Sequence, residues 1–143
     1  MRRISRPLLA IAISLLTPGF AMGATPQRVQ VTGEVIDTWC YLSEIMYALG
    51  TAHRQCAIWC AAGGVPVGLL GEDGQVYFIA EFEGRSEVLA DPALLELQTH
   101  QITVDGSMYE RDGLKYLLVS EVLKDEGIVN LTHEEYGIQP FGE

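Results

Sequence analysis

The sequence predicts a mainly β protein, a five-stranded OB-like Greek-key barrel with a helical insertion between strands 1 and 2 and a short helix between strands 3 and 4. Five segments carry the apolar–polar alternation or the short apolar runs that are typical of strands. A segment with helical periodicity separates the first strand from the second, and a shorter one separates the third from the fourth. This order of elements is that of an OB-fold. An open α+β sheet built from the same elements is the alternative.

Turn residues bound the five predicted strands. In the first strand Val29, Val31 and Val35 fall on one face, with Gly33 between them. A GEDG turn of the hairpin kind separates the second strand from the third, and an ERDG turn separates the fourth from the fifth. The predicted strands cover residues 28–37, 65–70, 75–82, 100–109 and 114–123.

The insertion is expected to hold two helices. Gly50 ends the first, and Thr51 is expected to cap a second over residues 52–62, which Gly63 and Gly64 close. The apolar stripe predicted for the first helix comprises Leu42, Ile45, Met46 and Leu49.

A short helix is expected between the third and fourth strands, in residues 90–98. Asp91 suits the N-cap position, because a carboxylate accepts hydrogen bonds from the free amides of the first turn. Pro92 suits the first helical position, where its missing N–H is not needed.

The first 23 residues match a secretory signal peptide. Arg2, Arg3 and Arg6 precede an uncharged run over residues 8–16, and Ala21-Met22-Gly23 offers small residues for cleavage. The run is too short for a lasting membrane span, although a retained anchor is the alternative. We therefore expect a periplasmic or secreted protein with no stable membrane insertion after cleavage. The predicted organisation is a signal peptide (1–23), an OB-like domain (24–126) and a C-terminal tail (127–143).

The chain is acidic, with a formal net charge of −10. Loss of residues 1–23 removes three arginines and no acidic side chain, which leaves six basic and 19 acidic side chains. A surface with this charge repels nucleic acid and anionic lipid, so we expect no nucleic-acid partner. It suits metal cations or a cationic partner, or it serves only solubility.

The chain has three cysteines, Cys40, Cys56 and Cys60. Thiols usually pair in an oxidising compartment, and an odd number leaves at least one unpaired, bound to a ligand or bridged to a partner. Within an intact helix Cys56 and Cys60 are too far apart for an unstrained disulfide. A bridge from Cys40 to either is easier, closing a loop of about 16 to 20 residues and stabilising the fold by roughly 3 kcal/mol.

One histidine lies on the same predicted helix as two of the cysteines. At about 100° per residue, His53, Cys56 and Cys60 share an arc of about 60°. If the helical hairpin brings Cys40 over this face, three sulfurs and one imidazole form a common tetrahedral set for Zn²⁺. Soft thiolates suit Cu(I) equally.

Two nearby residues could support this set. Met46 could add a soft ligand, and Asp37 could act as the acceptor that orients the histidine. His100, at the start of a strand, and His133, in the tail, are expected to be surface or structural residues. The sequence contains neither a Gly-x-Ser-x-Gly elbow nor a glycine-rich phosphate loop.

Three interpretations of the cluster stay open. It could hold copper or zinc, with haem iron as a weaker alternative. It could be a structural disulfide from Cys40 with one spare buried thiol, in which case Ala52, Cys56, Trp59 and Gly63 form an apolar helix face and the barrel binds a protein or a small ligand. It could be a thiol–disulfide oxidoreductase, which the three-residue spacing and the lack of a βαβ context disfavour.

We expect an exported, non-catalytic binding module whose partner is a metal ion or another protein. The residues expected to hold a soft transition metal are Cys40, His53, Cys56 and Cys60. The sequence does not predict the oligomeric state.

The run GEVIDTWCYL, followed by HRQCAIWCAAGGVPVGLL and GQVYFI, resembles a group of small, largely uncharacterised bacterial exported proteins with an OB-like domain. The resemblance covers about residues 31–123 and implies a periplasmic or secreted domain, but no particular reaction. More loosely, the chain is similar to periplasmic OB-fold carriers of haem or metal. The pattern of the group falls on Gly33, Asp37, Cys40, His53, Cys56, Cys60 and Pro66.

Overall fold

The computed structural model describes residues 24–45 and 48–132. The predicted signal peptide, Met46 and His133 lie outside the described residues. Across the described ranges, no helix is long and apolar enough to cross a membrane.

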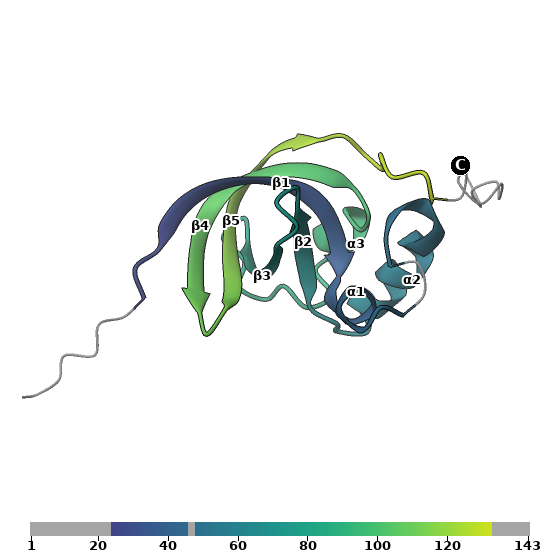
Figure 1. Ribbon diagram of the computed structural model, residues 1–143, viewed down its shortest axis with the longest axis horizontal. Helices are drawn as coiled ribbons and strands as arrows, with labels where there is room; N and C mark the ends of the chain where they lie inside the picture. Colours follow the sequence, from purple (N-terminus) through teal and green to yellow (C-terminus); the bar gives the residue numbers. More distant parts are fainter. Residues whose placement is uncertain (1–23, 46–47, 133–143) are drawn as a thin grey trace, which may run out of the picture.

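Five strands close into a barrel in the order β1-β2-β3-β5-β4, so the predicted OB-like barrel is confirmed (Figure 1). The β3–β5 pair is parallel and the other four pairs are antiparallel. The strands are β1 (Gln27–Asp37), β2 (Val67–Gly71), β3 (Val76–Phe82), β4 (Gln101–Arg111) and β5 (Leu114–Asp125).

Within residues 24–45 and 48–132, three helices accompany the barrel, at the predicted places in the chain. Helices α1 (Thr38–Ser43) and α2 (Gly50–Ala62) form the insertion between β1 and β2, and they lie together at one end of the barrel (Figure 1). Helix α3 (Pro92–Glu96) separates β3 from β4. Asp91 caps α3 as predicted, because its carboxylate accepts hydrogen bonds from the amides of Ala93 and Leu94.

The core lies inside the barrel and under α3. Val31 and Val35 of β1 point into it, as the alternation predicted. Burying each large aliphatic side chain contributes about 1.5 to 3 kcal/mol, so this apolar interior is the main source of stability. Its members are Val31, Val35, Ala61, Val67, Leu69, Tyr77, Ile79, Phe82, Leu94, Ile102, Val104, Leu117 and Val119.

The predicted apolar faces of the insertion are wrong. Leu42 is 58% exposed and Ile45 is 46% exposed. The reason is that α1 has only six residues and stops at Glu44, whose left-handed backbone turns the chain away. Trp59 of α2 is also exposed, because α2 buries the side of the helix that carries His53, Ala57 and Ala61 instead.

The predicted capping of α2 by Thr51 is also wrong. The helix begins at Gly50, and the N-cap residue Leu49 makes no side-chain capping bond. Distant groups satisfy the free amides instead. The amide of Gly50 donates to Oε1 of Glu34 (2.7 Å), and those of Thr51 and Ala52 donate to the carbonyl of Asn130 and to the hydroxyl of Thr132 (3.0 Å each).

Two of these acceptors belong to residues 126–132, which we term the strap. Figure 1 shows this yellow segment running from β5 to α2. Gly50 is required under the strap for two reasons. Its φ is +63°, and a Cβ atom there would lie 2.3 Å from the carbonyl oxygen of Asn130.

The strap contact can be measured with two matched glycine substitutions. Gly74→Ala introduces left-handed strain (φ +74°) into open space and should cost about 1 kcal/mol. Gly50→Ala adds the collision with Asn130 to the same strain and should cost about 2 to 4 kcal/mol. Urea unfolding of both variants measures the difference. Equal losses would show that the strap does not press on Gly50.

Candidate metal centre

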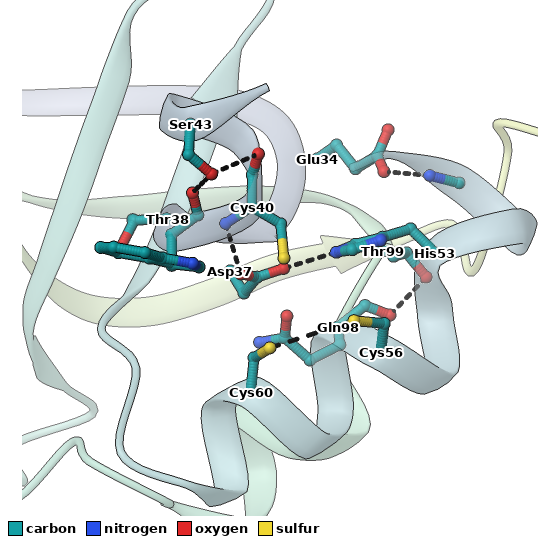
Figure 2. Close-up of polar contacts among 12 residues, drawn as sticks. Glu34, Asp37, Thr38, Cys40, Ser43, His53, Cys56, Cys60, Gln98 and Thr99 are labelled. Carbon is teal, nitrogen blue, oxygen red and sulfur yellow. Dashed lines mark hydrogen bonds and ion pairs between the residues drawn. The ribbon is translucent and has the colours of Figure 1, made fainter. Parts of the chain in front are cut away.

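Asp37 fixes the position of Cys40. It is the last residue of β1 and the N-cap of α1, and its Oδ1 accepts a hydrogen bond from the amide of Cys40 (2.9 Å). The side chain of Cys40 is therefore held in the first turn of α1, on the side that faces α2 (Figure 2). Only 3% of Cys40 is exposed.

The other two cysteines come from α2. Cys56 and Cys60 are one turn apart, and their Sγ atoms lie 4.0 Å from each other. Both residues are half-buried, and all three cysteines are free thiols. The Sγ atoms of Cys40, Cys56 and Cys60 lie within 4.8 Å of one another. Sulfurs that share a metal ion at about 2.3 Å are themselves about 4 Å apart, so the three need little movement to bind one ion.

His53 is held by Asp37 rather than by the sulfurs. Its Nε2 lies 2.6 Å from Oδ2 of Asp37, and both side chains are fully buried. The predicted orienting role of Asp37 is therefore present in the structure. Nδ1 of His53 is buried without a hydrogen-bond partner among the described residues.

The predicted four-residue set is thus arranged as two overlapping groups that share Cys40 (Figure 2). One group holds three sulfurs. In the other, the ligand atoms of Asp37, Cys40 and His53 lie within 4.8 Å of one another. The histidine is therefore near Cys40, as expected, but its nitrogen bonds a carboxylate. Asp37 itself joins the atoms that could contact an ion.

The charge state of the site follows from burial. Burial and the nearby Asp37 carboxylate raise the pKa of Cys40 to about 12, and the same two causes raise the pKa of Cys60. Burial acts to raise the pKa of Asp37, but hydrogen bonds from His53 and Cys40 outweigh it and hold that pKa below its usual range. Near neutral pH the site therefore contains a carboxylate beside protonated thiols, and an entering cation must displace protons.

Glu34 supports the start of α2, a role that sequence reasoning missed. Besides the amide of Gly50, its carboxylate accepts a hydrogen bond from the side chain of Asn130 (3.3 Å). Burial raises the pKa of Glu34, although both hydrogen bonds oppose the rise. The alternation of β1 predicts that Glu34 faces solvent. It is buried only because α2 and the strap pack over it.

The remaining described histidine takes no part in the cluster. His100 pairs with Asp125 at the end of β5, with 3.0 Å between Nδ1 and Oδ1.

Comparisons of the chain with protein-family models, with curated proteins and with solved structures gave no match. The resemblance of the HRQCAIWC run to an exported family stays a prediction.

The three thiols should differ in reactivity. In the native, reduced protein, iodoacetamide at pH 8 should modify Cys56 and Cys60 before Cys40, because Cys40 is buried and its pKa is about 12. Mass spectrometry of peptides after timed labelling gives the order. Unfolding in guanidinium should make the three rates similar. Native Cys40 reacting as fast as the other two would contradict the geometry.

Proposed function

We propose that the protein binds one soft metal ion, Cu(I) in preference to Zn²⁺, through the sulfurs of Cys40, Cys56 and Cys60. The observation that carries this proposal is the convergence of three free thiols within 4.8 Å, from two separate helices. Thiolates are soft ligands that select Cu(I) and Zn²⁺ over hard cations. The mature protein would be an exported, non-catalytic carrier or sequestering module.

The position of His53 favours Cu(I). A closed zinc site needs four protein ligands, and the fourth ligand here would have to come from Asp37 or from its buried partner His53. Its Nε2 already shares a 2.6 Å hydrogen bond with Asp37, in a fully buried pair. Coordination through Nε2 of His53 or through Oδ2 of Asp37 would break that pair and leave a buried group without its partner, which costs about 3 to 5 kcal/mol. Three thiolates satisfy Cu(I) without this step.

The exposure of the ligands favours reversible binding. Cys40 is buried, whereas Cys56 and Cys60 are half-buried, so an ion can enter and leave from the side of α2. Asp37 and His53 would stay outside the coordination sphere. Asp37 would position Cys40 and place a negative charge beside the ion, as outer partners of metal ligands commonly do.

A structural disulfide is the second candidate, and the same proximity favours it. The Sγ atoms of Cys40 and Cys60 lie within 4.8 Å of each other, and an exported protein meets oxidising conditions. A Cys40–Cys60 bond would join α1 to α2, remove two of the three ligands and leave Cys56 as the single thiol. Thiol titration of the isolated protein separates the two, because the metal site requires three thiols after removal of the ion.

The ligand set can be tested by competition with a chromogenic Cu(I) chelator, without oxygen. Cys40→Ser, Cys56→Ser and Cys60→Ser should each lower the affinity at least about 100-fold, since each removes one of three metal–sulfur bonds. His53→Gln should lower it less than tenfold. His100→Gln, which changes a histidine outside the cluster, is the control.

Two results would count against this assignment. A protein that takes up neither Cu(I) nor Zn²⁺ after full reduction would sink the metal proposal. A loss in His53→Gln as large as in the serine variants would show that the histidine is a ligand and that the site is of the zinc kind.

The affinity should rise steeply with pH. Cys40 and Cys60 have raised pKa values, so both are thiols near neutral pH and each loses a proton when the ion binds. Displacing two protons increases the apparent affinity by at least about 100-fold per pH unit. Chelator competition at pH 6.5 and 7.5, corrected for protonation of the chelator, measures this slope. A flat profile would mean that the sulfurs are not the ligands.

A further inference from the structure

The helical insertion exposes large apolar side chains on the same two helices that carry the sulfur cluster. Trp39 is 62% exposed and Trp59 is 70% exposed, and they are the two tryptophans of the chain. Each is a sequence neighbour of a predicted ligand, Cys40 or Cys60. Tryptophan is usually well covered in folded proteins and is enriched among residues that dominate binding interfaces.

Trp39 borders a groove of about 520 Å³ between α1 and the segment that follows α2. Trp39 and Leu42 form one wall, and residues 63–66 form the other. Trp59 belongs to α2, one helical turn before Gly63. The hydroxyl of Thr38 donates to the carbonyl of Pro66 (2.8 Å) and ties the two walls together. The groove is therefore already formed in the free protein.

The insertion is almost free of charge in an acidic protein. Residues 38–66 contain one acidic side chain, Glu44, and one basic side chain, Arg54, out of 19 acidic and nine basic in the whole chain. Apolar patches bordered by polar surface mark interaction sites. A second copy of this chain suits the patch poorly, since two strongly acidic barrels repel each other. Anionic lipid is repelled for the same reason.

We propose that this surface, the tryptophan face (Trp39, Leu42, Ile45 and Trp59), docks a metal-exchanging partner protein that holds the same soft ion with its own sulfur ligands. The partner would surround those ligands with apolar side chains and, further out, with lysine or arginine. The apolar part would cover the indoles, and the basic rim would be drawn to the acidic barrel. This inference rests on the metal-binding function proposed above.

The face and the ligands belong to the same two helices, which gives docking a chemical purpose. Cys56 and Cys60 are half-buried, whereas Cys40 is buried, so exchange can begin at the sulfurs of α2. Each Cu–S bond that breaks to one of them is replaced by a bond to a partner sulfur. The proton that the partner's thiol loses goes to the released cysteine through water. The ion stays Cu(I), and no electron is transferred.

The size of the face suits a brief encounter. A tryptophan side chain buries about 150 to 250 Å², so the two indoles together supply roughly half of the 800 Å² that each side of a standard stable interface covers. The complex should therefore form and dissociate quickly, with its rate controlled by charge.

The test measures transfer of Cu(I) from a synthetic two-cysteine peptide to the reduced protein. One peptide has leucine and lysine around its cysteines, and its match has serine and glutamate. The leucine–lysine peptide should deliver Cu(I) at least about tenfold faster, and high salt should reduce this advantage. The Trp39→Ser/Trp59→Ser double variant should lose the advantage while its Cu(I) affinity against a small chelator stays unchanged.

Leu114→Ser is the matched control. Leu114 is also exposed (45%), but it begins β5 at the β4–β5 hairpin, and Figure 1 shows that hairpin at the end of the barrel away from α1 and α2. This variant should keep the rate of the wild type. Equal rates for the two peptides, or an unchanged rate in the double tryptophan variant, would overturn the proposal.

Two further measurements separate the other outcomes. Docking of the metal-free leucine–lysine peptide should shift indole emission, which in this chain comes from Trp39 and Trp59 alone. This readout stands even if the protein binds no Cu(I), so failure of the metal site and failure of the docking face can be told apart. Dimerisation in the ultracentrifuge that the double variant abolishes, or binding to phosphatidylglycerol vesicles, would assign the face to another occupant.

Discussion

The carboxylate of Asp37 is the contact on which the arrangement of the insertion depends. One oxygen receives the amide of Cys40 and the other lies 2.6 Å from His53, so a single side chain at the end of β1 joins both helices to the barrel. Hydrogen bonds to a charged group contribute about 1.5 to 3 kcal/mol each. Their geometric effect matters more, because they turn Cys40 toward the face of α2 that carries the other two sulfurs.

The same strand also holds the first residue of α2. Glu34 lies three residues before Asp37 in β1. Its carboxylate accepts hydrogen bonds from the amide of Gly50 and from the side chain of Asn130. Helix α2 is thus attached to β1 twice within its first turn, at Gly50 and at His53. A six-residue α1 and an α2 without a side-chain cap of its own would be weak helices in isolation. Their orientation comes from these polar contacts with the barrel.

The sequence predicted the barrel well, since alternating β1 residues such as Val31 and Val35 and the capping residue Asp91 act through local chemistry. Sequence reasoning also predicted that Cys40 could reach the helix face of Cys56 and Cys60, and that Asp37 could be the hydrogen-bond acceptor for His53. It failed where burial depends on distant segments. Glu34 is covered by the strap, and Trp59 faces solvent because α2 packs on its alanine side, which the apolar spacing of the helix did not distinguish.

The strap has a consequence for the order in which the protein can be completed. Asn130 and Thr132 provide acceptors for the first turn of α2, and they lie about 70 residues further along the chain than the last cysteine. The barrel strands β1 to β5 are all made before the strap. Because synthesis starts at the N-terminus, all three cysteines are made before the residues whose acceptors hold the first turn of α2. The first turn of α2 therefore gains these two acceptors only after the last strand of the barrel has been made.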